Sequence, residues 1–233
     1  MEEICSGLLR ALDLIAARDP QVVEITLRAI FISLSSAFLA GIICIPLGGI
    51  IEFRHFWGKR ALITLIQTFY SLPTVTVGLL VFLLISRSGP LGGLNLLFSP
   101  AGMILGQAIL VSPIMIGLTI TALDGVGSPI RDTAKSLGAT EMQIIITVIK
   151  EARVAVIAAV LLGFGRTLSE VGVAMMIGGN IRGYTRVLTT AIALETSMGN
   201  LELSMALGII LIFISLAINL LLNRFQGRQE WRS

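Results

Sequence analysis

Two oppositely charged residues, Arg166 and Glu170, lie four positions apart within a long apolar stretch of the sequence. Residues four apart on an α-helix share a face, so the guanidinium and the carboxylate can form an ion pair. Pairing lowers the cost of placing either charge in hydrocarbon, and ionisable residues at membrane depth indicate a functional site. The pair could instead be a structural salt bridge between helices that fixes the packing of a dimer, and the sequence leaves both interpretations open.

Side chains that could carry out catalysis or bind a metal are otherwise scarce. The only histidine, His55, lies in a short polar segment, and neither cysteine, Cys5 or Cys44, has a neighbour at metal-ligand spacing. An intramembrane hydrolase needs a nucleophile and a base on facing helices, but Ser169 and Glu170 are sequence neighbours on different helix faces. The residues therefore predict neither a metal site nor a catalytic site, and a hydrolase stays only as an alternative.

The composition places most of the chain in a lipid bilayer. Of the 233 residues, 55% are hydrophobic and 13% are charged, whereas a soluble domain has about 25% charged residues. The mean hydropathy is +0.92. Because each helical crossing needs roughly 20 apolar residues, little length is left for a folded soluble domain. The net charge of +3 gives no support to nucleic-acid binding, and the G-x-x-x-x-G-K-[ST] motif of an ATP site is absent.

Five apolar stretches are long enough to cross the membrane as helices. They comprise residues 29–51, 61–85, 102–122, 154–178 and 203–222. Residues 1–20 mix charges with apolar positions, which argues against a secretory signal and predicts an amphipathic helix at the membrane interface or packed on the other helices. We therefore predict an all-α membrane protein with five transmembrane helices. Residues 1–20 form its amphipathic helix, 21–224 its transmembrane domain and 225–233 a tail.

Three prolines, Pro46, Pro73 and Pro113, lie inside these stretches and should kink the helices that contain them. Five crossings cannot divide into two equal inverted halves, and the sequence shows no internal repeat. A pore would therefore form more naturally between two copies of the chain related by a two-fold axis.

Basic residues are distributed unequally between two sets of connecting segments. One set carries Arg54, Lys59, Arg60, Arg131, Lys135, Lys150, Arg153, Arg224, Arg228 and Arg232, whereas the other carries Arg10, Arg18, Arg87, Arg182 and Arg186. Short cytoplasmic loops of membrane proteins are enriched in lysine and arginine. We therefore expect the first set and the C-terminus in the cytoplasm, and the N-terminus outside.

The longest polar segment, residues 123–153, has the pattern of a short helix, a glycine break and a second helix. Ile130, Ala134 and Leu137 are expected to share one face of the first helix, which Gly138 interrupts. Such a surface can insert into a groove on a soluble partner, or it can be a solvated connection between two helices. Periodicity alone leaves both interpretations open.

This segment resembles the E-A-A-x-x-x-G loop of the permease subunits of ATP-binding-cassette importers. The resemblance lies in Asp132, Thr133, Ala134, Lys135, Ser136, Leu137, Gly138 and Ala139. Asp and Thr replace the Glu and the first Ala of the pattern, and the Ile-x-Leu-Pro that commonly follows is absent. The resemblance implies that these residues form the coupling loop on which an ATPase subunit docks.

A second resemblance lies in GFGRTLSEVG at residues 163–172, GGNI at 178–181 and TRVLTTAIALET at 185–196. These stretches are similar to importer permeases of the molybdate, sulfate and tungstate branch, and most similar to those for tungstate. The resemblance extends over about residues 20–224. It implies a type I importer permease fold, in which two copies form the pathway for an oxyanion.

The same resemblance implies the partners. They are a second copy of the chain, two ATPase subunits, an extracytoplasmic oxyanion-binding protein and the lipid of the cytoplasmic (inner) membrane. ATP and magnesium would be used by the ATPase, and this chain would bind no cofactor. Molybdate and sulfate are alternative cargoes. An ion-coupled secondary transporter, with Glu170 as a proton or sodium site, is the alternative that needs no ATPase.

A dianion could pass along hydroxyls, backbone N–H groups and an occasional arginine without being trapped by a dense cluster of cations. The candidates for the translocation pathway are Arg166, Thr167, Ser169, Glu170, Thr189 and Thr190. Because Glu170 would repel an anion, we expect Glu170 and Arg166 to neutralise each other beside the pathway. They would then organise the pathway rather than bind the cargo.

Overall fold

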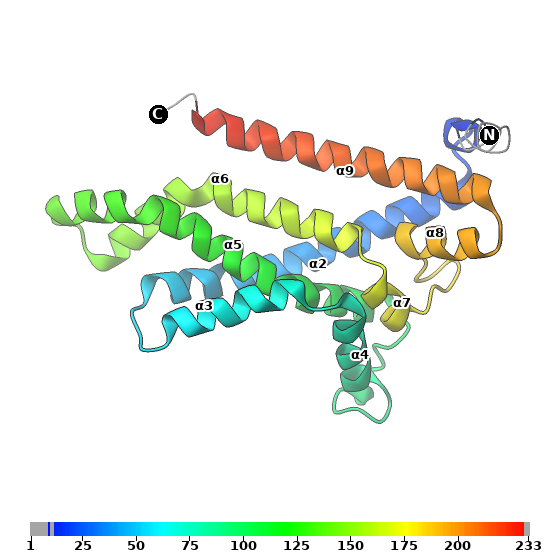
Figure 1. The fold of residues 1–233 in the computed structure, drawn as a ribbon, viewed down its shortest axis with the longest axis horizontal. Coiled ribbons are helices and arrows are strands. Elements are labelled where there is room, and N and C mark those ends of the chain that lie inside the picture. Colours follow the sequence, from blue (N-terminus) through cyan, green and yellow to red (C-terminus); the bar gives the residue numbers. More distant parts are fainter. Residues whose placement is uncertain (1–8, 10–11, 231–233) are drawn as a thin grey trace.

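The computed structural model describes the backbone of residue 9 and of residues 12–230, and the side chains of these residues except 127–129 and 225–230. Every regular element in this described part is a helix (Figure 1), which confirms the predicted all-α class. The elements are α2 (Pro20–Phe53), α3 (Lys59–Thr68), the 3₁₀ turn η1 (Phe69–Ser71), α4 (Thr74–Ile85), the 3₁₀ turn η2 (Gly92–Leu94), α5 (Pro100–Ser136), α6 (Glu141–Leu168), α7 (Gly172–Gly178), α8 (Leu188–Ser197) and α9 (Leu201–Glu230). Of the amphipathic helix predicted at 1–20, residues 12–16 are helical, whereas residues 1–8, 10 and 11 lie outside the described part.

The first long helix, α2, starts nine residues before the predicted apolar stretch because its N-terminus is capped. The Asp19 carboxylate accepts hydrogen bonds from the backbone N–H groups of Gln21, at 2.9 Å, and Val22, at 3.2 Å. Pro20 occupies the first position of the helix, where its missing N–H has no intrahelical partner to lose. The 34-residue helix continues through Pro46 without ending.

Helix α5 differs from the prediction of a separate short helix after a membrane span. The Ser99 hydroxyl caps its start by accepting from Gly102 N at 3.1 Å, and the helix then runs 37 residues without a break to Ser136. The predicted glycine break follows, with Gly138 at φ +76°, and Thr140 begins α6 through a capping box with Gln143. The predicted loop at 123–153 is therefore a helical hairpin that extends both helices.

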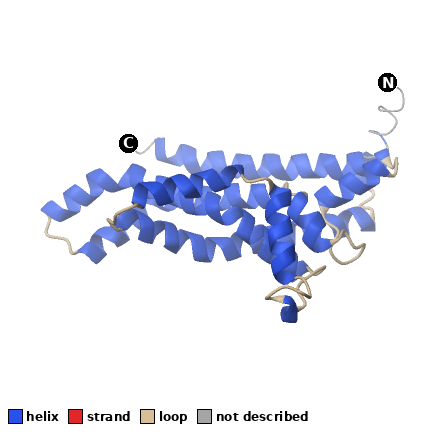
Figure 2. Ribbon diagram, turned by 60° about the horizontal axis from the view of Figure 1, so that its bottom comes forward, coloured by secondary structure: helices blue, strands red, loops and turns tan. Residues whose placement is uncertain are grey.

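The second predicted span, residues 61–85, is broken rather than continuous. Helices α3 and α4 meet at an angle of 100°. The bend lies at Pro73, because proline disfavours the helical conformation of the residue before it, and Leu72 is extended with ψ 133°. Figures 1 and 2 both show α4 leaving the long axis of the bundle. The fourth predicted span, residues 154–178, is also divided, into α6 and α7.

The core of the bundle lies where α2, α5 and α6 pack on one another, with α9 along one side (Figure 2). Small residues allow the close approach of α2 and α5, since a Cβ atom on Gly48 would lie 2.9 Å from Thr119 Cβ. The opposite face of α2 exposes large apolar side chains, among them Phe31 and Phe38, and α9 exposes Ile212. Exposed apolar faces on long helices fit contact with lipid chains.

Three helices in the described part of the chain are long and apolar enough to cross a membrane, and the bent α3–α4 pair would add a fourth. The three are Pro20–Phe53, Pro100–Val126 and Leu201–Arg224. Helix α6 has 28 residues, but Lys150, Glu151 and Arg153 interrupt its apolar sequence. The total of five crossings therefore stays a prediction.

Candidate functional site

The break between α6 and α7, residues 169–171, is built around the carboxylate of Glu170. This side chain is only 2% exposed, and both of its oxygens have partners. Oε2 accepts from Arg166 Nη1 at 2.7 Å, which confirms the predicted ion pair, and Oε1 accepts from the backbone N–H of Val173 at 3.2 Å. Glu170 therefore pairs with the last turn of α6 and caps the first turn of α7 at the same time.

Two buried threonines fasten this break to neighbouring helices. Thr189 on α8 donates its hydroxyl to the carbonyl oxygen of Glu170 at 2.7 Å. The hydroxyl of Thr167 lies 2.9 Å from the carbonyl oxygen of Phe164 and 3.2 Å from that of Ser33 on α2. The end of α6 is therefore tied both to α2 and to α8 through groups that water does not reach.

The ion pair is exposed on one side only. Glu170 is buried, whereas 35% of the Arg166 side chain is exposed. Beside it the surface exposes Ser169 together with Val171 and Met175, each 40% exposed. The guanidinium, and not the carboxylate, is thus the charged group that faces the surface here.

The six predicted pathway residues do not all have the same surroundings. Arg166, Thr167, Glu170 and Thr189 come together at the break. Thr190 is buried, and its hydroxyl exchanges hydrogen bonds of 3.1 Å with the backbone N–H and carbonyl of Val187 at the start of α8. The Ser169 hydroxyl is on the exposed side, although it donates to the carbonyl oxygen of Arg166 at 3.1 Å. In this conformation Arg166 and Ser169 are the members that a passing solute could reach from outside the packed helices.

Close glycine contacts hold α4 against α7, next to the break. A Cβ atom on Gly172 would lie 2.8 Å from Thr74 Oγ1, and one on Gly78 would lie 3.2 Å from Val173 Cα. Because real Cβ atoms rarely approach other atoms so closely, both positions favour glycine. The bent segment α3–α4 therefore ends in direct contact with the helix that Glu170 caps.

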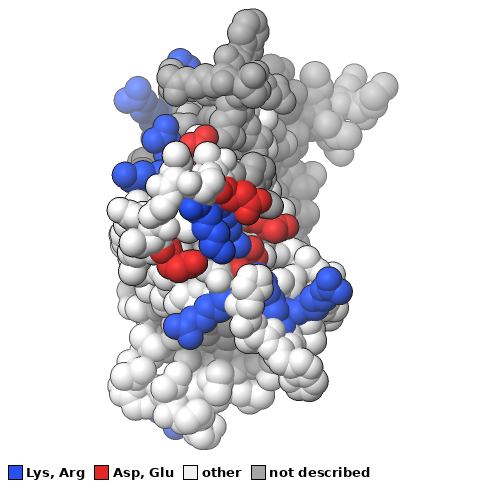
Figure 3. Space-filling model, turned by 90° about the vertical axis from the view of Figure 1, so that its left-hand side faces the viewer, with Lys and Arg blue, Asp and Glu red and all other residues white. Residues whose placement is uncertain are grey.

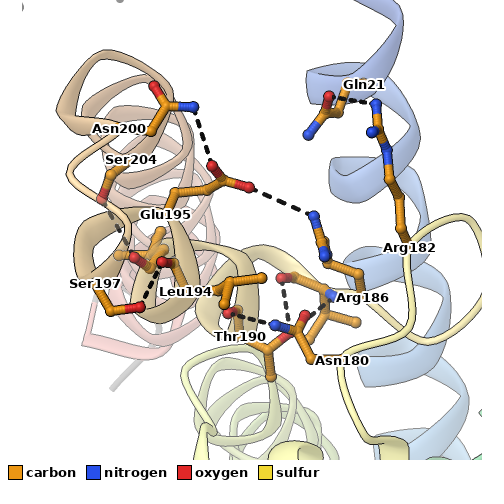
Figure 4. A network of polar contacts seen from close by, with 12 residues as sticks. Gln21, Asn180, Arg182, Arg186, Thr190, Leu194, Glu195, Ser197, Asn200 and Ser204 are labelled. Carbon is orange, nitrogen blue, oxygen red and sulfur yellow. Dashed lines mark hydrogen bonds and ion pairs between the residues drawn. The ribbon is translucent and has the colours of Figure 1, made fainter.

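A second polar network, shown in Figure 4, lies beyond the break around the start and end of α8. Glu195, a buried residue that the sequence reasoning did not single out, accepts from Arg186 Nη1 at 3.4 Å and from Asn200 Nδ2 at 3.0 Å. Arg182 donates to Gln21 Oε1 at 3.0 Å and so ties this region to the start of α2. A signal for Glu195 is its position relative to Arg186, since the two charges flank residues 187–194, of which all but Thr189 and Thr190 are apolar.

The opposite end of the bundle is formed by the tip of the α5–α6 hairpin, residues 132–142, which we call the hairpin tip. Ala134 and Ala139 turn inward and pack against a buried apolar cluster that includes Val148. Leu137 and Met142 point outward, with 81% and 65% of each residue exposed. The prediction that Leu137 shares a face with Ile130 and Ala134 is wrong, because α5 ends at Ser136 and Leu137 has already left the helix.

Charged and polar residues lie close in sequence to these two apolar side chains. The exposed members are Asp132, Thr133, Lys135, Ser136 and Glu141. Figure 3, which views this end of the molecule, shows acidic and basic side chains gathered in the middle of the face. Exposed apolar side chains on a polar, charged face are typical of surfaces that bind another protein.

A further buried carboxylate, Glu52, lies at the same end and was not predicted. It is 6% exposed and sits in the last turn of α2. Lys59 Nζ lies 2.9 Å from Glu52 Oε2 and Arg131 Nη2 lies 3.6 Å from Oε1, so Glu52 pairs with cations from α3 and α5. In the described residues no group of three or more His, Cys, Asp or Glu could hold a metal ion.

Comparison with known proteins places this arrangement in a family. Residues 44–232 match the family described as binding-protein-dependent transport system inner membrane component. The tungstate uptake system permease protein TupB of Peptoclostridium acidaminophilum is 41% identical over 97% of this chain and 99% of its own length. A probable anion ABC transporter permease protein of Haloferax volcanii is 39% identical over 91% of this chain and 94% of its own length.

The fold has a counterpart among solved structures. The MetNI methionine ABC transporter, in inward-facing conformations, matches with a TM-score of 0.63 over 86% of this chain and 96% of the MetNI chain. The sequence identity is 15%, so this likeness concerns the fold alone. Because the family match covers most of the sequence, the chain belongs to the binding-protein-dependent transport system inner membrane components.

Proposed function

We propose that this chain is the permease subunit of an ATP-binding-cassette importer that carries an oxyanion, tungstate before other anions, across the cytoplasmic membrane. The observation that carries the proposal is the 41% identity to a tungstate uptake system permease over 97% of the chain. The chain is not an enzyme, and ATP hydrolysis belongs to a separate ATPase subunit, which also uses the ATP and magnesium. Molybdate and sulfate are the alternative cargoes.

The hairpin tip is the surface on which the ATPase docks. Its exposed Leu137 and Met142 supply apolar contact area, and the surrounding charges supply orientation. The tip is rigidly connected to the membrane part of the chain, because α5 is continuous from Pro100 to Ser136. Two copies of the chain, each with one ATPase, would give the pathway between them a two-fold axis.

The break around Glu170 lies beside the pathway. Arg166 offers the anion a partly exposed positive group. The buried Glu170 holds this guanidinium in place and makes the net charge of the pair close to zero. An anion is then attracted without being trapped. The polar network around Arg186 and Glu195 belongs to the outer side, where an extracytoplasmic binding protein delivers the anion, and the N-terminus lies on that side.

ATP binding and hydrolysis would rock the two copies between inward-open and outward-open states. Co-purification from cells that express the complete importer tests this assignment. The tagged chain should retain an ATPase subunit, and anion uptake should stop when ATP is depleted. An ion-coupled secondary transporter would instead purify without an ATPase and respond to a proton or sodium gradient.

A further inference from the structure

The Glu52 cluster, formed by Glu52, Lys59 and Arg131, joins three helices at one buried carboxylate. Lys59 Nζ lies 2.9 Å from Glu52 Oε2 and also donates to the Glu52 carbonyl oxygen at 2.8 Å. Arg131 Nη2 lies 3.6 Å from Glu52 Oε1, which is ion-pair distance rather than hydrogen-bond distance. The guanidinium carbon of Arg131 also lies 4.8 Å from the centre of the Phe53 ring.

Glu52 is the main polar anchor of Arg131. The Nε and Nη2 atoms of Arg131 are buried and have no hydrogen-bond partner among the described groups. Buried guanidinium nitrogens depend on a nearby anion to offset their lost hydration, and Glu52 is the carboxylate placed to do so for Arg131, whose side chain is 26% exposed. Removing the Glu52 charge would therefore loosen both cations at once.

The Glu52 cluster is the polar attachment of helix α3, which buries few of its own side chains. Of its ten residues only Ile66 is buried. The first residue of α3 is Lys59, which is bound to Glu52. The turn after the end of α3 places Tyr70 against α5, where a Cβ atom on Gly117 would overlap the Tyr70 hydroxyl. Helix α3 is thus attached by Lys59 at its start, by Ile66 and its packing on α5 along its length, and by Tyr70 in the turn after its end.

The cluster also adjoins the surface and the site already described. Arg131 immediately precedes Asp132, the first residue of the hairpin tip. From Lys59, α3 leads through the bend at Pro73 to α4, whose Gly78 lies against Val173 of α7. The hairpin tip is therefore connected to α7 in three steps. Arg131 and Lys59 both contact Glu52, the chain runs from α3 to α4, and α4 packs against α7.

We propose that Glu52 is a positioning residue that makes α3 move together with the hairpin tip, so that motion of the ATPase reaches the α4–α7 contact beside the transport site. This inference rests on the proposed importer function. Without the Glu52 charge, α5 would still follow the ATPase, but Lys59 would keep only its hydrogen bond to the Glu52 carbonyl oxygen and the link from α3 to Arg131 would be lost. ATP would then be hydrolysed with less transport per molecule hydrolysed.

The test uses the complete importer in proteoliposomes and measures anion uptake and ATP hydrolysis in the same preparation. Glu52→Gln should reduce the ratio of uptake to hydrolysis by about 5- to 150-fold, the range expected for coupling between sites, while ATPase recovery and hydrolysis stay near those of the unmodified importer. Glu151→Gln, at an exposed site on α6, is the matched control and should leave the ratio unchanged.

A second pair of variants keeps the inference testable if Glu52→Gln fails to fold. Arg131→Lys retains the positive charge and should preserve most of the ratio, whereas Arg131→Gln should lower it. Combining Glu52→Gln with Arg131→Gln should lower the ratio of uptake to hydrolysis by less than the product of the two single effects, since both changes remove the same interaction. Folding is checked by size-exclusion elution of each purified importer.

The inference would be overturned if Glu52→Gln lowered uptake and hydrolysis in parallel. It would also be overturned if a folded Glu52→Gln importer kept the same ratio of uptake to hydrolysis. A different failure belongs to the proposed function itself. If the unmodified chain recovers no ATPase and transports without ATP, the importer assignment falls before Glu52 is tested.

Discussion

The hydroxyl of Thr189 donates a 2.7 Å hydrogen bond to the carbonyl oxygen of Glu170, so α8 is fastened to the point where α6 and α7 part. Both residues are buried. Helices α6 and α7 therefore hold the side chain of Glu170, which neutralises Arg166, and α8 holds its backbone. A glutamate whose carboxylate and backbone are both held can keep the partly exposed arginine beside it in one orientation.

Replacing Glu170 with Gln should impair both stability and transport. The change leaves Arg166 without its counter-charge, and we expect a loss of about 1–3 kcal/mol, less than for a fully buried pair because Arg166 is 35% exposed. Thermal unfolding in detergent and anion uptake in cells measure the two effects. Glu151→Gln is the exposed control. Unchanged stability, transport and dimer assembly in Glu170→Gln would show that the ion pair does not organise this site.

Thr189→Val should destabilise the protein while keeping the shape of the side chain. It leaves the Glu170 carbonyl oxygen buried without its hydroxyl partner, at a cost of about 1–3 kcal/mol. Thr64→Val is the comparison, because the Thr64 hydroxyl is exposed and bonds only within its own helix, and should change stability by less than about 0.5 kcal/mol. Equal unfolding temperatures for the two variants would mean that α8 is not held through this bond.

Gly117→Ala should disturb the bend between α3 and α4. The added Cβ would overlap the Tyr70 hydroxyl, and such overpacking costs typically about 1–3 kcal/mol. Gly208→Ala is the control, since a Cβ atom there would meet nothing within 4 Å, and it should be neutral or stabilising. Unfolding temperatures of the purified variants make the comparison. If Gly117→Ala behaves like Gly208→Ala, Tyr70 does not fix the turn against α5.

Leu137→Asp should reduce ATPase recovery without unfolding the chain. Leu137 is 81% exposed, so its replacement removes apolar contact area from the hairpin tip and little from the core. Leu201→Asp, at a 53% exposed leucine on the opposite end of the bundle, is the matched control. The readout is the amount of ATPase that co-purifies with each tagged variant. Full recovery with Leu137→Asp would place the docking surface elsewhere.

The sequence predicted those parts of the fold that depend on local signals. The Arg166–Glu170 pair follows from helical spacing, and the Gly138 turn follows from the conformational freedom of glycine. The family assignment, suggested by two stretches of sequence, is confirmed by the match over residues 44–232. The roles of the individual pathway residues stay predictions.

The breaks in two predicted spans depend on signals that composition does not carry. The predicted span 154–178 includes the polar residues Ser169 and Glu170, and α6 ends there because Glu170 caps α7 and its carbonyl oxygen accepts a hydrogen bond from Thr189, 19 residues further along the sequence. Pro73 predicts a kink, but the 100° angle of the bend and the packing of the Tyr70 hydroxyl against Gly117 depend on contacts with α5 that the sequence does not show. Glu52 stands among basic residues, so its burial between two helices was not visible from the charge pattern.

ATP-driven oxyanion import can be measured as uptake of radiolabelled tungstate into proteoliposomes that contain this chain with its ATPase and binding protein. We expect uptake that requires ATP and that excess unlabelled tungstate suppresses more strongly than molybdate or sulfate does. Uptake that needs an ion gradient but no ATP would contradict it. So would the absence of tungstate uptake by an importer that hydrolyses ATP.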